Sequence, residues 1–202
     1  MEGAHSGDYD GRSRAGSDAV GREDKGHGGE CDGGATVEGG WSRPRVGLVK
    51  LNVDAGVVDG IRTGLGIVCR NASGSIEWCV SIQSVAGMTP EVAEALAVLE
   101  GFKEARSSGH AKVEVESDCC GVIADLKARK RGRSELALIY DDIFSLYNCF
   151  DIVSFSFVSR NINTVAHGLA HVVSWTVGRR SWVCDLPNWI LCKANEDLMN
   201  MN

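Results

Sequence analysis

Three acidic residues of this chain, Asp54, Glu94 and Asp118, stand where they could hold a divalent metal ion. Asp54 and Asp118 each end a strand-like run, and Glu94 lies in a helical stretch between those runs. Carboxylate oxygens are the ligands that Mg²⁺ and Mn²⁺ prefer, and two such ions about 3.5–4 Å apart can promote phosphodiester cleavage. Acids at strand ends are also common as solvated surface residues, so the chemistry depends on whether the fold brings the three together.

The segments around these acids have regular apolar periodicity. Leu51 and Val53 alternate with polar residues, as in a half-buried strand, whereas Leu96, Leu99 and Phe102 repeat at helical spacing. Strands are predicted over Leu48–Asp54, Gly64–Asn71, Ser75–Ser84, Lys112–Glu116 and Asp151–Ser159. Helices are predicted over Pro90–Ser108, Cys119–Ala128, Ser134–Asn148 and Asn163–Val177. The order β-β-β-α-β-α-α-β-α predicts an α/β fold with a mixed five-stranded sheet flanked by helices.

This arrangement predicts where the acids lie. If the first and fourth predicted strands are adjacent and parallel, Asp54 and Asp118 emerge at their carboxyl ends, where open α/β sheets place their sites. Glu94 lies about one turn into a helix that begins after Thr89 with Pro90, a favourable cap and first residue. Gly178 is the expected stop of the last helix.

Composition divides the 202-residue chain into parts. Residues 1–44 are rich in Gly, Ser and charged residues and poor in large apolar ones, which is typical of a disordered tail or linker. Residues 45–180 form the predicted domain, and 181–202 a C-terminal extension. No run is apolar enough for a signal peptide or a membrane span. The part after residue 44 has 16 basic and 18 acidic residues, which does not favour a tight nucleic-acid binder.

The eight cysteines include no Cys-x-x-Cys pair, and most lie in apolar runs. This pattern favours buried free thiols over disulfides or a zinc site. We therefore expect an intracellular protein, nuclear or cytoplasmic and not secreted, and a monomer.

Short motifs surround the acids in a fixed order. They are Trp41-Ser42-Arg43-Pro44, Val49-Lys50-Leu51-Asn52-Val53-Asp54, Gly64-x-Gly66 with Arg70-Asn71-x-x-Gly74, Ala93-Glu94-Ala95-Leu96, Val115-Glu116-Ser117-Asp118, and Arg160-x-x-Asn163-x-x-Ala166-His167-x-Leu169-Ala170. From Trp41 to Pro187 the chain resembles the ribonuclease H type 1 domain, in its plant reverse-transcriptase-like branch related to retroelements. The resemblance implies the ribonuclease H-like fold and endonucleolytic cleavage of the RNA strand of RNA–DNA hybrids with Mg²⁺ or Mn²⁺, through two ions.

By this resemblance Asp54, Glu94 and Asp118 are the catalytic, metal-binding carboxylates. The family's enzymes carry a fourth acid in the last helix, and that position holds His167 here. An imidazole can bind a divalent metal but adds no negative charge and prefers softer ions, so His167 is either a catalytic metal ligand or a structural helix residue. His171 is expected to be a partly exposed helix residue.

Several residues are candidates for contacting nucleic acid. Arg129, Lys130 and Arg131 form a basic run that either holds the hybrid's phosphates or is a solvated loop, with nuclear import as a further interpretation. Arg160 is placed to contact phosphate, and Asn163 to contact nucleic acid or cap the last helix. Asn71 and Ser73 either approach a groove or simply build a turn.

Two further function classes stay open. The domain could keep the fold and nucleic-acid affinity while having lost efficient turnover, as a retroelement remnant. It could also act as a protein-interaction module through its acidic tail.

Overall fold

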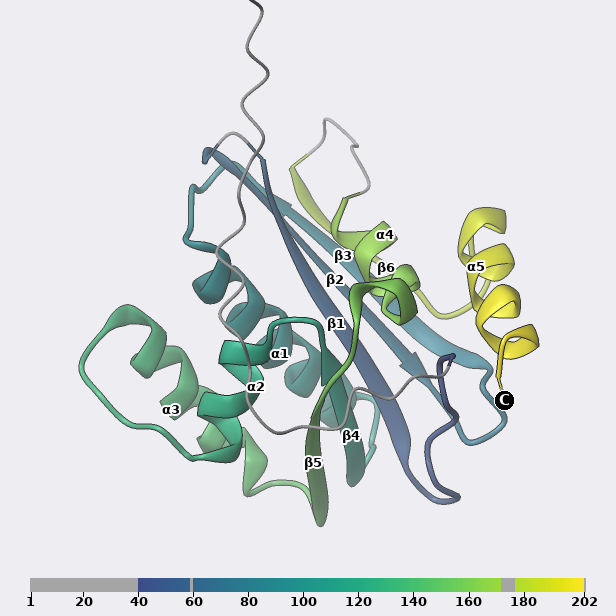
Figure 1. Cartoon of the computed structure of the whole chain (residues 1–202), viewed down its shortest axis with the longest axis horizontal. Coiled ribbons are helices and arrows are strands. Elements are labelled where there is room, and N and C mark those ends of the chain that lie inside the picture. The colour runs from purple at the N-terminus through teal and green to yellow at the C-terminus, as the bar shows by residue number, and fades with distance from the viewer. Residues whose placement is uncertain (1–39, 59, 172–176, 202) are drawn as a thin grey trace, which may run out of the picture. The chain divides into compact units, whose positions relative to one another are not determined.

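The sheet of this protein has six strands, arranged in the order β5-β4-β1-β2-β3-β6 (Figure 1). The computed structural model describes residues 40–58, 60–171 and 177–201. The strands are β1 Val49–Val58, β2 Arg62–Arg70, β3 Ile76–Ser84, β4 Lys112–Ser117, β5 Ile152–Phe157 and β6 Gly178–Trp182. β1, β4 and β5 are parallel to one another, whereas β1 to β3 form an antiparallel meander that β6 extends.

Helices cover both faces of the sheet (Figure 1). They are α1 Pro90–Ser107, α2 Cys120–Lys127, α3 Glu135–Tyr147, α4 Thr164–Ala170 and α5 Asn188–Met199, with a 3₁₀ turn η1 at Arg160–Ile162. The main core lies between the sheet and α1 to α3, and a smaller core lies between the other face, α4 and α5. Thr89 caps α1 by accepting a hydrogen bond from Val92 N. Among the described helices, none has the length and apolarity that a membrane crossing requires.

The predicted α/β class and the order of the first nine elements are confirmed, but two elements were missed. The sheet has a sixth strand, β6. It was missed because an exposed edge strand such as Gly178–Trp182 needs no apolar alternation. The helix α5 buries only Ile190, Ala194 and Asp197, too few for a clear stripe. β6 also spans the predicted boundary at residue 180, so the sheet continues past it.

The last predicted helix was too long. α4 ends at Ala170 instead of Val177, and residues 172–176 lie outside the described part of the chain. Gly178 does not stop a helix but begins β6, with a φ of +139° that glycine adopts without strain.

The segment before β1 also packs on the domain. Trp41 and Pro44, assigned to the tail, are buried on the domain, and residues 1–39 lie outside the described part. The indole Nε1 of Trp41 donates to Asn52 Oδ1 at 3.0 Å, and its ring lies under the guanidinium of Arg70 at 4.3 Å. This segment therefore covers the polar face of β1.

The cysteines are only partly as predicted. Cys69 and Cys79 are buried free thiols, but Cys149, Cys184 and Cys192 are exposed. Cys120 is disulfide-bonded, so the expectation of free thiols throughout was wrong for that residue.

Candidate metal centre

Asp54, Glu94 and Asp118 meet at one end of the parallel strands. Val53 of β1 pairs with Ser117 of β4. The residue that follows each of them, Asp54 and Asp118, therefore lies at the same end of the sheet. Glu94 approaches from the second turn of α1. One carboxylate oxygen of each acid lies within 4.8 Å of the other two. The fold thus brings the three predicted acids together.

Backbone and side-chain donors hold Glu94 in place. Its Oε1 accepts a hydrogen bond from Ala55 N at 3.2 Å, and its Oε2 accepts one from Ser117 Oγ, also at 3.2 Å. Ser117 Oγ in turn accepts from Cys119 N at 3.0 Å. Glu94 is therefore oriented by the strands that carry the other two acids.

The cluster carries more negative charge than its surroundings compensate. Burial, followed by the charge of Asp118, raises the pKa of Asp54 to about 7. Burial, followed by the charges of Asp54 and Asp118, raises the pKa of Glu94 well above its usual value. Asp54 is 1% exposed, and its Oδ1 has no hydrogen-bond partner among the described residues. A divalent cation would supply both the missing partner and the missing positive charge, so the donor set fits a hard metal ion.

His167 lies beside this cluster on α4. Its Nδ1 is 2.9 Å from Asp54 Oδ2, within hydrogen-bond distance. Burial, followed by the charge of Arg160, lowers the pKa of His167, which favours the neutral imidazole that metals bind. Both the position of His167 beside Asp54 and its neutral form are therefore compatible with metal binding.

His171 also approaches Asp54, which the sequence reasoning missed. Its Nδ1 lies 3.8 Å from Asp54 Oδ2 and 3.0 Å from the backbone oxygen of His167. Asp54, His167 and His171 form a second potential metal-binding group that shares Asp54 with the acid cluster. The i, i+4 spacing of the two histidines was the signal, because such residues lie on one face of a helix.

Glycines allow α4 to approach the sheet this closely. A Cβ on Gly66 would lie 2.1 Å from the backbone oxygen of Ala166, and one on Gly56 would lie 2.7 Å from His171 Nε2. The Gly64-x-Gly66 motif therefore serves the packing of α4 on β2, and it brings His167 to Asp54.

Arg160 and Asn163 contact the acid cluster directly. Arg160 Nε donates to Asp118 Oδ2 at 2.9 Å, although its side chain is 71% exposed. Asn163 Nδ2 donates to Val53 O at 2.8 Å and to Asp118 Oδ1 at 3.3 Å. Asn163 occupies the N-cap position of α4 but makes no side-chain cap bond, so the capping interpretation was wrong.

Asn71 and Ser73 lie away from the acids. By strand register, Arg70 pairs with Lys50, four residues before Asp54, so the turn begins roughly 13 Å along the sheet from the cluster. Asn71 Oδ1 accepts hydrogen bonds from Ser73 N, Ser73 Oγ and Ser75 N. These contacts account for both residues as turn formers, and their contact with nucleic acid stays a prediction.

The basic run lies between α2 and α3 and is largely paired. Lys130 Nζ lies 3.0 Å from Asp125 Oδ2, and Arg131 pairs with Asp141. Arg129, with a φ of +50°, places its guanidinium 4.4 Å from the centre of the Tyr147 ring. Local acids thus offset part of the predicted phosphate-binding charge.

The fold is similar to that of ribonuclease H structures. The structure resembles that of RNase H1 from Halobacterium salinarum (21% identity, 60% of this chain and 93% of that chain, TM-score 0.57). It also resembles the N-terminal RNase H domain of a Mycobacterium tuberculosis protein (21% identity, 75% of this chain and 98% of that chain, TM-score 0.56). A third similar structure is LC11-RNase H1 in complex with an RNA/DNA hybrid (19% identity, 60% of this chain and 92% of that chain, TM-score 0.55).

The sequence itself assigns the family. Residues 52–173, more than half of the chain, match the model of the family described as reverse transcriptase-like, and the chain belongs to that family. No curated protein matches the sequence significantly.

Proposed function

We propose that this protein cleaves the RNA strand of RNA–DNA hybrids endonucleolytically, using divalent metal ions held by Asp54, Glu94, Asp118 and His167. The observation that carries the proposal is the convergence of three carboxylates, one of which, Asp54, has a buried Oδ1 with no hydrogen-bond partner among the described residues. The likeness to RNase H1 structures, one of them holding an RNA/DNA hybrid, supports it at the level of the fold.

Each residue has a role in this proposal. Mg²⁺ or Mn²⁺ at the cluster would activate a water molecule and stabilise the departing oxygen. Asp54 and Asp118 supply oxygen ligands from adjacent strands, and Glu94 is fixed between them by Ala55 N and Ser117 Oγ. His167 supplies a neutral nitrogen where the enzymes of the family have an acid.

Arg160 is proposed to exchange partners during binding. Its guanidinium pairs with Asp118, and the exposure of its side chain lets it leave that carboxylate without large rearrangement. A phosphate of the hybrid would then replace Asp118 as its partner, because guanidinium groups bind phosphate in bidentate fashion.

The direct test is cleavage of a labelled RNA–DNA hybrid by the purified chain with Mg²⁺ or Mn²⁺. Asp54→Asn is the matched control, since it keeps the side-chain shape and removes the shared charge. We expect cleavage by the natural chain and a loss of at least 10³-fold, or about 4 kcal/mol of barrier, in the control. Equal background cleavage by both proteins with either ion would contradict the proposal that this protein is a ribonuclease.

A second candidate function is nucleic-acid binding with weakened turnover in a retroelement-derived domain. The pairing of Arg160 with Asp118 and the histidine at the fourth position favour it, because both reduce the negative charge available to metals. In that case the protein binds the hybrid equally with and without Mg²⁺, and Asp118→Asn leaves binding unchanged. Metal-dependent cleavage would exclude this alternative.

A further inference from the structure

A second group of metal-binding side chains lies away from the acid cluster. It consists of Cys69 near the end of β2, Glu77 at the start of β3, and His110 in the connection between α1 and β4. One donor atom of each lies within 4.8 Å of the other two. Cys69 is three residues beyond Gly66, the strand partner of Asp54, and so roughly 10 Å along the sheet from that acid.

A β-bulge brings Glu77 into this group. The strand register shifts between Cys69 and Arg70, which pair with Trp78 and Ile76 and leave Glu77 without a partner of its own. Bulges redirect a side chain locally. Glu77 Oε2 consequently lies 3.0 Å from Nε2 of His110, a residue of the α1–β4 connection.

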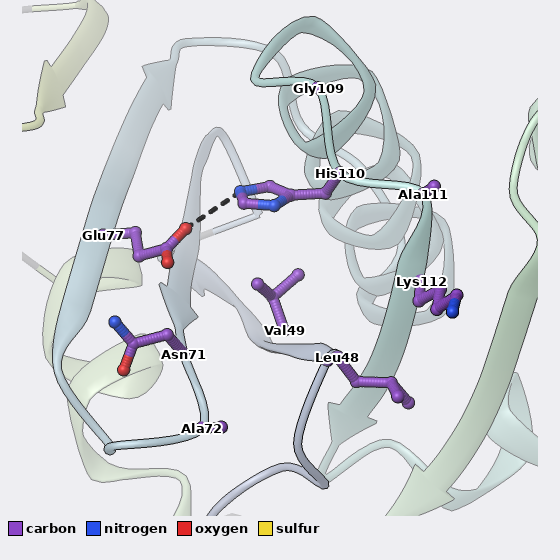
Figure 2. A pocket seen from close by; sticks show the side chains of 10 residues that line it. Leu48, Val49, Asn71, Ala72, Glu77, Gly109, His110, Ala111 and Lys112 are labelled. Carbon is purple, nitrogen blue, oxygen red and sulfur yellow. Dashed lines mark ion pairs between the residues drawn. The ribbon is translucent and has the colours of Figure 1, made fainter.

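Two of the three residues, Glu77 and His110, line a cavity of about 420 Å³, whereas Cys69 lies behind them in the core. Figure 2 shows Glu77 and His110 pointing toward one another at this cavity, with Val49 and Asn71 beside them. The side chains of Glu77 and His110 are 33% and 20% exposed, so a small ion and a water molecule have access to them. The cavity supplies the entry path and the room for an additional ligand.

The chemistry of the donors selects a particular ion. A thiolate, an imidazole and a carboxylate together suit Zn²⁺, whereas Mg²⁺ and Ca²⁺ prefer oxygen ligands alone. One thiolate and one carboxylate also balance the two positive charges of the ion, which lowers the cost of burying it. Ligand atoms around tetrahedral zinc lie roughly 3.3–3.8 Å apart for bonds of about 2.0–2.3 Å, so small side-chain shifts would complete the site.

Among the residues that the structure describes, none forms a hydrogen bond with the thiol of Cys69. Its side chain is fully buried in the main core, and burial, followed by the charge of Glu77, raises the pKa of the thiol. The thiol therefore stays protonated when no cation is present. A bound cation reverses this, because coordination displaces the proton.

We propose that Cys69, Glu77 and His110 bind one Zn²⁺ ion, with a water molecule from the cavity as its fourth ligand. The ion ties the α1–β4 connection to the β2–β3 hairpin and stabilises the domain independently of the acid cluster. Without the ion, the same residues would form only the Glu77–His110 ion pair beside a buried thiol.

Cobalt substitution tests this site without depending on activity. For this test, the full chain is prepared with the substitutions Cys149→Ser, Cys184→Ser and Cys192→Ser, which remove exposed thiols. Asp54→Asn is added to weaken the acid cluster. We expect one equivalent of Co²⁺ to give a sulfur-to-cobalt charge-transfer band, which the acid cluster cannot produce because it contains no cysteine. Zn²⁺ should abolish the band by displacement.

Two variants locate the ligands. Cys69→Ser and His110→Ala should each lose the band, and the partly exposed His110 can be changed without opening the core. Cys79→Ser is the matched control: it alters another buried cysteine that packs against α4 and α5, and should keep the band. Absence of the band in the starting protein, or its persistence in Cys69→Ser or His110→Ala, would overturn the proposal.

Discussion

His167 Nδ1 lies 2.9 Å from Asp54 Oδ2, so α4 joins the acid cluster through a neutral imidazole instead of a carboxylate. The contact depends on the close packing of α4 against the glycines of β1 and β2. Asp54 thereby belongs to two potential metal-binding groups, one made of three acids and one made of an acid and two histidines.

The fourth position should set the metal preference. Replacing His167 with Asp adds negative charge beside Asp54 and should raise the Mg²⁺-supported cleavage rate about tenfold, or ~1.4 kcal/mol, relative to the Mn²⁺-supported rate. Rates on a labelled hybrid over a titration of each ion measure this. His167→Asn, which adds no charge, should show no such gain, and equal behaviour of the two variants would contradict the prediction.

The stability of the metal-free protein should decrease as the pH rises from about 4 to about 7. The folded state raises the pKa of Asp54 from 3.8 to about 7, so it binds a proton that the unfolded chain releases in this window. The contribution of Asp54 to this loss should be about 4 kcal/mol at about 1.36 kcal/mol per pKa unit. Glu94, whose pKa is raised as well, adds to the loss. Urea unfolding at a series of pH values measures it.

Asp54→Asn is the control for this pH effect. It removes the titrating group, so the variant should be more stable than the natural chain at pH 7 without metal and should show a flatter pH profile. Saturating Mg²⁺ should narrow the difference, because the cation stabilises the ionised carboxylates. An identical pH profile for both proteins would show that Asp54 is not the group responsible.

The ion pair between Arg70 and Asp197 should be important for stability. Arg70 Nη2 donates to Asp197 Oδ2 at 2.6 Å, and both side chains are buried between β2 and α5. Asp197→Ala should cost about 3–5 kcal/mol of unfolding free energy, because it leaves a buried guanidinium without its partner. Glu114→Ala, which breaks a pair with the 74% exposed Arg45, should cost at most about 1 kcal/mol. Denaturant titrations measure both losses of unfolding free energy. Similar values for the two variants would contradict the expected difference between the buried and the exposed ion pair.

Gly66 should be essential for positioning α4. Its substitution by Ala would place a Cβ 2.1 Å from Ala166 O, forcing the helix away from the sheet and His167 away from Asp54. We expect a loss of about 1–3 kcal/mol in stability together with lower hybrid cleavage. Gly121→Ala is the matched control in α2, where nothing beyond its own stretch of helix lies within 4 Å of the added Cβ, and it should stabilise by up to about 1 kcal/mol. Thermal unfolding of both variants provides the comparison.

Local periodicity predicted the framework of this fold. The alternation around Leu51 and Val53 and the helical repeat of Leu96, Leu99 and Phe102 are local consequences of one buried face, so β1 and α1 were found correctly. Because parallel strands end together, the meeting of Asp54 and Asp118 followed from the order of these elements. The helical pattern placed Glu94 one turn into α1, and the family motifs then added the fourth position at His167.

Only the tertiary structure decided which residues meet across long separations. The exposed edge strand β6 needs no apolar alternation, and α5 depends on Asp197 reaching Arg70, so neither leaves a periodic signal. Trp41 follows a stretch of tail-like composition, and its place in the domain depends on the hydrogen bond to Asn52. His171 near Asp54, and Glu77 redirected by a bulge toward Cys69 and His110, likewise depend on packing and register. Periodicity reports which face of a single element is buried, whereas these contacts depend on which distant partner buries it.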